Sequence, residues 1–197
     1  MTDAAGCKAD LVQYLQEARD AVLLKIDGLS EYDVRRPLTP TGTNLLGLVK
    51  HLAFVEHGYL GAVFGRPHPE VVAWFAAGPD DNDDLWATAD ESRADVVAGY
   101  RGAWAHAAAT IEARSLDDVG RVPWWGDGGR DVTLHRVLVH VIAETHRHAG
   151  HADIVRELVD GSVGLRSAGD NLPERDDRWW REYRDRLEQT ARAAAGE

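Results

Sequence analysis

The stretch from His140 to Asp153 holds the densest group of side chains able to bind a metal ion or transfer a proton. Four such side chains recur within it at intervals of three and four residues: His140, Glu144, His148 and His151. Apolar residues at helical spacing surround the stretch, which predicts the middle of one long helix. On a helical wheel with His140 at zero, the other three fall at roughly 40°, 80° and 20°. The four polar side chains therefore share one stripe of that helix.

Two other histidines of the segment, His135 and His146, fall on the far side of the wheel, at roughly 220° and 240°. The clustering on the stripe is therefore selective. A histidine and a carboxylate four residues apart lie about 6 Å from each other along a helix, close enough to bind one metal ion. The spacing leaves three pairs open: His140 with Glu144, Glu144 with His148, and His148 with His151.

A third ligand would have to come from a facing helix, as in many metal sites of helical bundles. His51 is the candidate, because its apolar neighbours place it on the core-facing stripe of a second helix. Glu56 and His57 fall at roughly 140° and 240° from His51 and should point away. A lone inward histidine is more often hydrogen-bonded in a core than bound to a metal. Only its combination with the pairs above makes a metal site an equal alternative.

The sequence predicts five helical segments, two of which carry these side chains. Apolar periodicity predicts helices over about residues 8–27, 44–64, 85–113, 132–159 and 173–195. Residues 30–42 should form a loop with at most one helical turn, and 65–82 a long structured loop whose aromatics cover one end of the core. We find no convincing pair of strands. The predicted fold class is all-α, a bundle of up to five helices.

An acidic run from Asp80 to Asp84 precedes the third predicted helix. Carboxylates at a helix N-terminus are stabilised by the helix dipole. The run lacks the glycine and the distal glutamate of an EF-hand loop, so we expect a helix terminus rather than a calcium site.

Trp124 and Trp125 lie in the glycine-rich connection that leads into the fourth predicted helix. They could form the wall of a pocket beside the polar stripe, or a hydrophobic plug over one end of the bundle. The sequence does not favour either alternative.

The composition limits the kinds of partner. The 197 residues include 33 acidic and 22 basic side chains, a net charge of −11, which argues against binding to nucleic acid or to anionic membranes. We find no signal-peptide pattern and no apolar run long enough to span a bilayer, so we expect a cytoplasmic protein. The single cysteine, Cys7, lies near the N-terminus, and neither a disulfide framework nor a catalytic thiol is expected.

Two segments of the sequence resemble the DinB/YfiT-like superfamily of metal-binding four-helix bundles. They are LLGLVKHL, from Leu45 to Leu52, and the run from His140 to Glu157 with the pattern HxxxExxxHAGHADIVRE. The chain looks closest to the actinobacterial branch related to mycothiol-dependent S-transferases and to the mycothiol-dependent maleylpyruvate isomerase. The resemblance implies a DinB-like four-helix bundle over residues 1–161. Residues 162–197 would form a linker and an additional C-terminal helix, packed on the bundle or on the partner subunit of a homodimer.

The resemblance also implies a ligand set. In that superfamily the second helix supplies one histidine, and the last bundle helix supplies an i, i+4 pair that is glutamate and histidine in isomerase-like members. On this chain the metal ligands become His51, Glu144 and His148. His151 and His140 lie one turn to either side and become substrate-facing groups, of which either could be the catalytic base. Two histidines and a carboxylate leave a position open, as in catalytic zinc sites, and the same set could hold Fe²⁺ or Ni²⁺. We expect Zn²⁺.

Zinc with an open position can bind a small thiol and lower its pKa, which requires no protein cysteine. The expected function is therefore a metal-dependent thiol S-transferase. The resemblance implies mycothiol as the thiol co-substrate, with an electrophile as the second small-molecule partner. Two alternatives remain: another metal-dependent hydrolase or isomerase on the same site, and a non-catalytic metal-binding stress-response protein. The isomerase proper is disfavoured, because the chain shows no match for its substrate arginine.

Two charged residues flank the polar stripe. Asp153 lies at roughly 220° from His140 and should be structural. Arg147, at roughly 340°, could pair with a substrate carboxylate, although a salt bridge to a neighbouring helix is the more common role.

Overall fold

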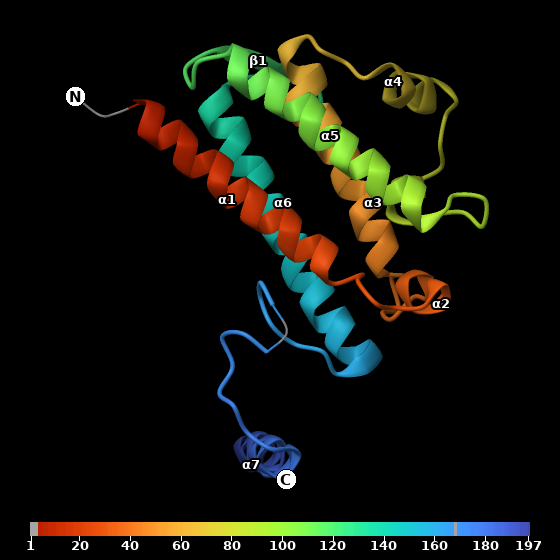
Figure 1. Ribbon diagram of the computed structural model, residues 1–197, viewed down its shortest axis with the longest axis vertical. Coiled ribbons are helices and arrows are strands. Elements are labelled where there is room, and N and C mark those ends of the chain that lie inside the picture. Colours follow the sequence, from red (N-terminus) through yellow and green to blue (C-terminus); the bar gives the residue numbers. More distant parts are fainter. Residues whose placement is uncertain (1–3, 168) are drawn as a thin grey trace.

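A computed structural model describes residues 4–167 and 169–197 of the chain (Figure 1). Its α-helices are α1 (Ala4–Leu24), α2 (Glu31–Arg35), α3 (Leu45–Glu56), α4 (Pro69–Ala76), α5 (Arg93–Ala113), α6 (Leu134–Asp160) and α7 (Asp177–Ala195). A π-helix, η1 (His57–Gly61), and a 3-10 turn, η2 (Ala62–Phe64), continue α3, and a second 3-10 turn, η3 (Asp83–Leu85), precedes α5. The strands β1 (Val119–Val122) and β2 (Arg130–Thr133) form a hairpin.

Helices α1, α3, α5 and α6 form a four-helix bundle. In Figure 1, α1 lies along α6 and α3 lies along α5. Helix α3 also contacts α6, which brings the two predicted metal-binding helices together. The prediction of a mostly helical, DinB-like bundle is confirmed.

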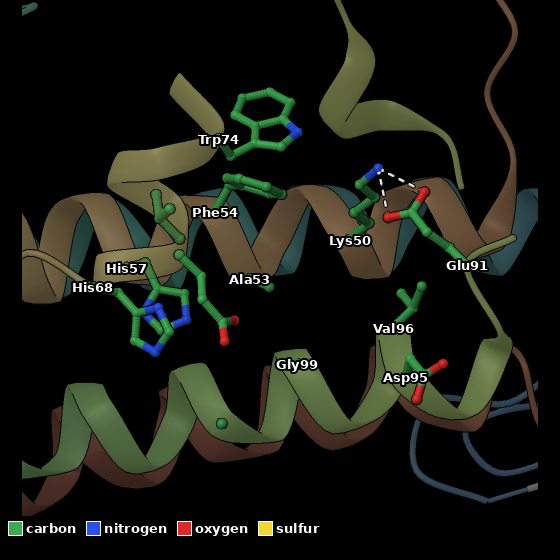
Figure 2. Close-up of a pocket in the computed structure, with 13 residues that line it drawn as sticks. Lys50, Ala53, Phe54, His57, His68, Trp74, Glu91, Asp95, Val96 and Gly99 are labelled. Atoms are coloured by element: carbon green, nitrogen blue, oxygen red, sulfur yellow. Dashed lines mark hydrogen bonds and ion pairs between the residues drawn. The ribbon is translucent and has the colours of Figure 1, made fainter. Parts of the chain in front are cut away.

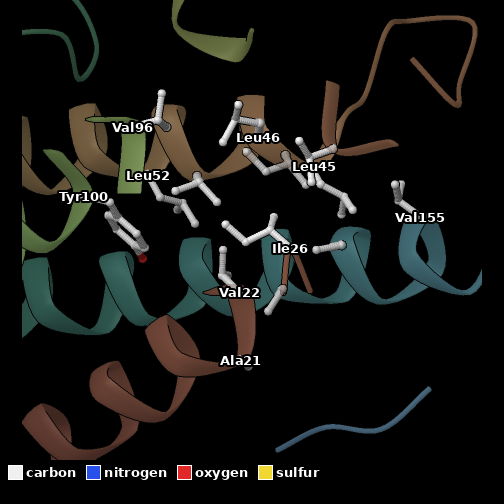
Figure 3. Packing of buried hydrophobic residues seen from close by; sticks show 14 residues of the cluster. Ala21, Val22, Ile26, Leu45, Leu46, Leu52, Val96, Tyr100 and Val155 are labelled. Atoms are coloured by element: carbon white, nitrogen blue, oxygen red, sulfur yellow. The ribbon is translucent and has the colours of Figure 1, made fainter. Parts of the chain in front are cut away.

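Two clusters of buried apolar side chains hold the bundle together. The first lies between α1, α3, α5 and α6 and includes Val22, Leu45 and Leu52, with Tyr100 at its edge (Figure 3). The second lies toward the hairpin and is centred on Leu60 and on residues of α6 such as Leu138. Helix α6 contributes to both clusters, and α3 contributes to the first directly and to the second through its continuation η1. The polar groups between these helices are therefore held on a rigid scaffold.

Helix α3 begins close to the predicted start of its helix, and its N-cap is Asn44. The Asn44 side chain accepts a hydrogen bond from the backbone N–H of Gly47 at 2.7 Å. The predicted helical span to Phe64 is also found, but α-geometry ends at Glu56. The π-helix that follows changes the direction in which the residues after His57, such as Tyr59, project, which a wheel with a fixed angle per residue cannot predict.

The expectation that the chain has no strand pair is wrong. Strands β1 and β2 pair antiparallel, with Val119 opposite Thr133, and Val122 and Val132 point into the core. Each strand has only four residues, too few for an alternating pattern to be clear. Helix α6 consequently begins at Leu134, after the N-cap Thr133, and not at Val132.

The third bundle helix starts eight residues later than predicted. Its N-cap is Ser92, whose hydroxyl accepts from the backbone N–H of Asp95, and residues 83–85 form the separate turn η3. The preceding loop also contains helix α4, which has no buried residue. Trp74 of α4 packs on Phe54 with ring centroids 4.5 Å apart, whereas Phe75 is 62 % exposed. The predicted aromatic cover is therefore only partial.

Helix α7 is amphipathic, yet none of its residues is buried. Figure 1 shows it beyond the end of the bundle that carries α2. The division at residue 161 and the packing of α7 on the bundle or on a partner subunit stay predictions. Within the described ranges, none of the helices combines the length and the apolar character needed to cross a bilayer.

Candidate metal centre

The side chains of His51, Glu144 and His148 converge between α3 and α6. Glu144 Oε1 lies 3.1 Å from His148 Nε2 and 3.8 Å from His51 Nε2. One ligand atom from each of the three residues lies within 4.8 Å of the others, and no other such group of His, Cys, Asp or Glu is found among the described residues. Bonds of about 2.0 to 2.2 Å from one ion to nitrogen and oxygen ligands span separations of this size. The three residues therefore fit a metal ion.

The three side chains are partly shielded from solvent. His51, Glu144 and His148 keep 20 %, 27 % and 13 % of their side-chain surface exposed. Burial raises the pKa of Glu144, but the imidazoles of His148, His51 and His140 outweigh it, and the carboxyl is held below its usual pKa. Burial, followed by the proximity of His51, lowers the pKa of His148. Both effects favour the protonation states that a metal requires, a carboxylate and a neutral imidazole.

Asp84 orients the imidazole of His51. Its Oδ2 lies 2.6 Å from His51 Nδ1, on the side of the ring opposite Glu144. Metal-binding histidines commonly donate their second N–H to a carboxylate in this way. Sequence reasoning missed this role, since it assigned the acidic run to a helix terminus. That assignment is wrong because α5 begins only at Arg93, and nothing in the run distinguishes Asp84 from its acidic neighbours.

His148 is contacted on its far side by His151. The two Nδ1 atoms lie 3.3 Å apart, while His148 Nε2 faces Glu144. His151 itself is exposed. A cavity of about 520 Å³ opens beside these two histidines, and Asn44, Leu85 and Trp86 belong to its wall. A small molecule entering this cavity would reach His148 directly.

The other end of the polar stripe meets an aromatic group. The indole N–H groups of Trp124 and Trp125 donate to Tyr59 Oη at 3.0 and 2.8 Å. The ring of His140 lies 4.6 Å from that of Tyr59 and 4.9 Å from that of Trp125, centroid to centroid. Trp125 also packs against the second core cluster. The loop thus contacts the polar stripe, as a pocket wall would, and also covers part of the core.

His140 itself is half-buried one turn before Glu144. Burial lowers its pKa, the nearby Glu144 carboxylate raises it, and Arg136 lowers it, with a net decrease. The imidazole is therefore neutral at pH 7 and able to accept a proton.

Helices α3 and α6, which supply the candidate ligands, both lie in a region of the chain that matches a known protein family. A family model described as Mycothiol-S-transferase matches residues 10–161. The chain belongs to the mycothiol S-transferase family. The match covers the bundle and all three candidate ligands and ends at the C-terminus of α6, so α7 lies outside the family region. No curated protein matches the sequence.

The other residues that the sequence analysis of this mycothiol S-transferase family member names all lie outside the candidate ligand set. His135 and His146 are exposed on the far faces of α6, as the wheel predicts. Asp153 pairs with Lys25 at 2.7 Å between its Oδ1 and Nζ, the structural role expected for it. Arg147 is exposed, and no ion pair joins it to the rest of the described chain, so the expected salt bridge is absent there.

Proposed function

We propose that the protein is a zinc-dependent mycothiol S-transferase that joins the thiol to a small electrophile. The observation that carries the proposal is the convergence of His51, Glu144 and His148 beside a cavity, in a chain that belongs to this family. Two neutral imidazoles and one carboxylate give the donor set of a catalytic zinc site with a position left for substrate. Fe²⁺ or Ni²⁺ would accept the same donors, and zinc is preferred because the reaction involves no redox change.

The metal would be held by His51 Nε2, His148 Nε2 and a carboxylate oxygen of Glu144. When bound, it lowers the pKa of a coordinating thiol, so that the thiolate is available at neutral pH. Asp84 keeps the proton of His51 on Nδ1, which leaves the Nε2 lone pair directed at the site. His151 limits the rotation of the His148 ring from its other side.

In the conjugation, the thiol sulfur forms a bond to a carbon atom of the electrophile. The bond between this carbon and its leaving group breaks, and the leaving group departs with the electron pair. The thiol proton is transferred to a base. We assign this role to His151 or His140. His151 borders the cavity beside His148, and His140 is the more shielded of the two and adjoins Glu144. Tyr59 and Trp125 cover His140 and exclude water from that side.

Metal analysis of purified wild type, His51→Ala and Glu144→Ala tests the site. We expect about one zinc per wild-type chain and little in either variant, because two ligands hold zinc poorly. His135→Ala is the matched control, since His135 is an exposed histidine on the far face of α6. Full metal occupancy in both ligand variants would refute the proposed ligand set.

Conjugation assays with mycothiol, bacillithiol and glutathione test the reaction. We expect the zinc-loaded protein to consume mycothiol in the presence of a bimane or halogenated aromatic electrophile, and to prefer it over the other two thiols. If the protein holds zinc but conjugates no thiol, another metal-dependent hydrolase or isomerase, or a non-catalytic metal-binding role, replaces the proposal. The cytoplasmic location and the homodimer stay predictions.

A further inference from the structure

A second histidine cluster lies away from the metal centre, between the start of η1, the N-cap of α4 and the middle of α5. It consists of His57, His68 and His106. The His57 ring centroid lies 4.3 Å from that of His68 and 5.3 Å from that of His106, and the remaining pair is 5.6 Å apart. The S-transferase reaction uses none of these residues. The wheel prediction that His57 points away from His51 is in agreement with this position.

Buried ring nitrogens in the cluster lack partners. His57 is only 7 % exposed, and the Nδ1 atoms of His57 and His68 are buried with no hydrogen-bond partner among the described residues. His106 Nε2, in contrast, lies 2.7 Å from the carbonyl oxygen of Arg66, which can only accept. Leaving a buried polar atom unpaired costs roughly 1 to 3 kcal/mol, so two such atoms in one cluster point to a missing ligand.

A groove leads from His57 and His68 along α3 (Figure 2). Its volume is about 430 Å³, within the range of small-molecule sites, which begins at about 300 Å³. Figure 2 shows His57 and His68 at one end and Lys50 with Glu91 at the other, with Phe54 and Trp74 between them. The wall from α5 is low, because Gly99 and Gly102 contribute no side chains to the groove.

The charges of the groove select against anions. Three carboxylates line it, those of Glu70, Glu91 and Asp95, against one lysine. Lys50 is already paired with Glu91 at 3.0 Å, so the Glu70 and Asp95 carboxylates have no ion pair in the described part of the chain. Burial, then His68 and His106, lower the pKa of His57 to about 4, so its ring is neutral at pH 7. The groove therefore carries negative charge and neutral acceptors.

The spacing of the ligand atoms argues against a metal ion as the ligand. In the parts of the chain that the structure describes, the ligand atoms of this cluster do not meet the spacing that His51, Glu144 and His148 satisfy. An organic donor fits better than an ion.

We propose that this groove binds a primary amine with an apolar or aromatic body. A primary ammonium group carries three N–H donors. It would donate to the Glu70 carboxylate and, once the His57 and His68 rings turn toward the groove, to their buried Nδ1 atoms, while its body lies against Phe54 and Trp74. Binding needs no bond-making step and no metal, and it is independent of the reaction proposed for the other face of α3.

Calorimetric titration of the full-length protein with 2-phenylethylamine and with phenylacetate tests the inference. Phenylacetate has the same ring but the opposite charge. We expect the amine to bind at least about tenfold more tightly, the fold-change that corresponds to one hydrogen bond with a charged group. Equal affinity for the two probes, or no binding of the amine, would overturn the proposal.

Variants then locate the binding. We expect His57→Leu and Glu70→Gln each to weaken amine binding by about tenfold. Glu70 is exposed, so its variant should fold even if His57→Leu does not, and Glu157→Gln, which removes an exposed carboxylate of α6, should bind like wild type. Unchanged affinity in Glu70→Gln would contradict the assignment. The proposal would also be contradicted if His51→Ala still bound zinc and the double variant His51→Ala/His57→Leu did not, because the histidine cluster would then bind a metal ion.

Discussion

Asp84 Oδ2 lies 2.6 Å from His51 Nδ1, and this contact joins the turn η3 to the helix that supplies the first candidate metal ligand. A carboxylate only accepts hydrogen bonds, so the His51 proton is fixed on Nδ1 and the Nε2 lone pair faces Glu144. The turn is thus a positioning element for the metal centre, although it lies 33 residues further along the chain than His51.

Replacing Asp84 should weaken metal binding without removing a ligand. In Asp84→Ala we expect zinc affinity to fall by about 10- to 100-fold, because His51 loses its fixed tautomer and orientation. Competition with a chromogenic zinc chelator measures the affinity. Asp81→Ala removes an exposed carboxylate of the same acidic run and should behave as wild type. Equal zinc affinity in the two variants would show that Asp84 does not orient His51.

The His57 cluster should make the fold sensitive to acid. The folded-state pKa of His57 is about 4, below the usual value of about 6.5 in an unfolded chain. As the pH falls from about 6.5 to 4, the unfolded state therefore binds the proton first, and stability decreases. The difference amounts to at most about 3 kcal/mol. Urea unfolding at pH 7 and pH 4 should show a smaller loss of stability for His57→Leu than for wild type.

The control for this measurement is His135→Leu, which removes an exposed histidine. Its loss of stability between the two pH values should equal that of wild type. If His57→Leu also follows wild type, the acid sensitivity comes from carboxylates elsewhere and not from this cluster.

The bundle helices could be predicted from the sequence because their apolar residues recur over many turns. The 27 residues of α6 and the 21 of α1 give long periodic patterns. The hairpin and α4 could not be predicted in the same way, since four residues per strand and eight in a helix without a buried residue carry little periodicity. The start of α5 was misplaced because the acidic run resembles a helix terminus, whereas Ser92 is the cap.

The candidate ligands could be predicted in part. The wheel placed four polar groups on one stripe, but it left three pairs open, and only the family resemblance selected Glu144 with His148. The structure brings this pair to His51. Asp84 and the His57 cluster could not be predicted, because both depend on contacts between segments far apart in the sequence. Neither leaves a periodic pattern in the sequence.

A buried ion pair should make α1 and α3 interdependent. Arg19 Nε and Nη2 donate to the Glu56 carboxylate at 2.8 and 2.5 Å, and both side chains are almost fully buried. Burial raises the pKa of Glu56 despite the opposing effect of Arg19. In Arg19→Met the unpaired carboxyl should destabilise the fold by about 3 to 5 kcal/mol in urea unfolding.

A double variant separates the pair from the packing around it. Arg19→Met with Glu56→Leu should recover most of the loss, because no buried charge remains. Arg178→Met breaks the exposed pair with Glu182 in α7 and should change stability by less than about 1 kcal/mol. A double variant as unstable as the single one would mean that packing of the Arg19 stem, and not its charge, dominates.

Gly47 should be required for the metal centre although it bears no ligand. A Cβ atom built on Gly47 would lie 1.8 Å from the carbonyl oxygen of Leu85 and 2.8 Å from Asn44 Oδ1. Leu85 directly follows Asp84 in η3, so Gly47→Ala must push this turn away from α3. We expect both a lower zinc affinity and a destabilisation of about 1 to 3 kcal/mol from overpacking.

Gly150→Ala is the matched control in α6, since a Cβ there meets nothing within 4 Å. The stability of this variant should be unchanged or higher by up to about 1 kcal/mol. If Gly47→Ala keeps both wild-type zinc affinity and stability, the close packing of η3 on α3 does not position the site.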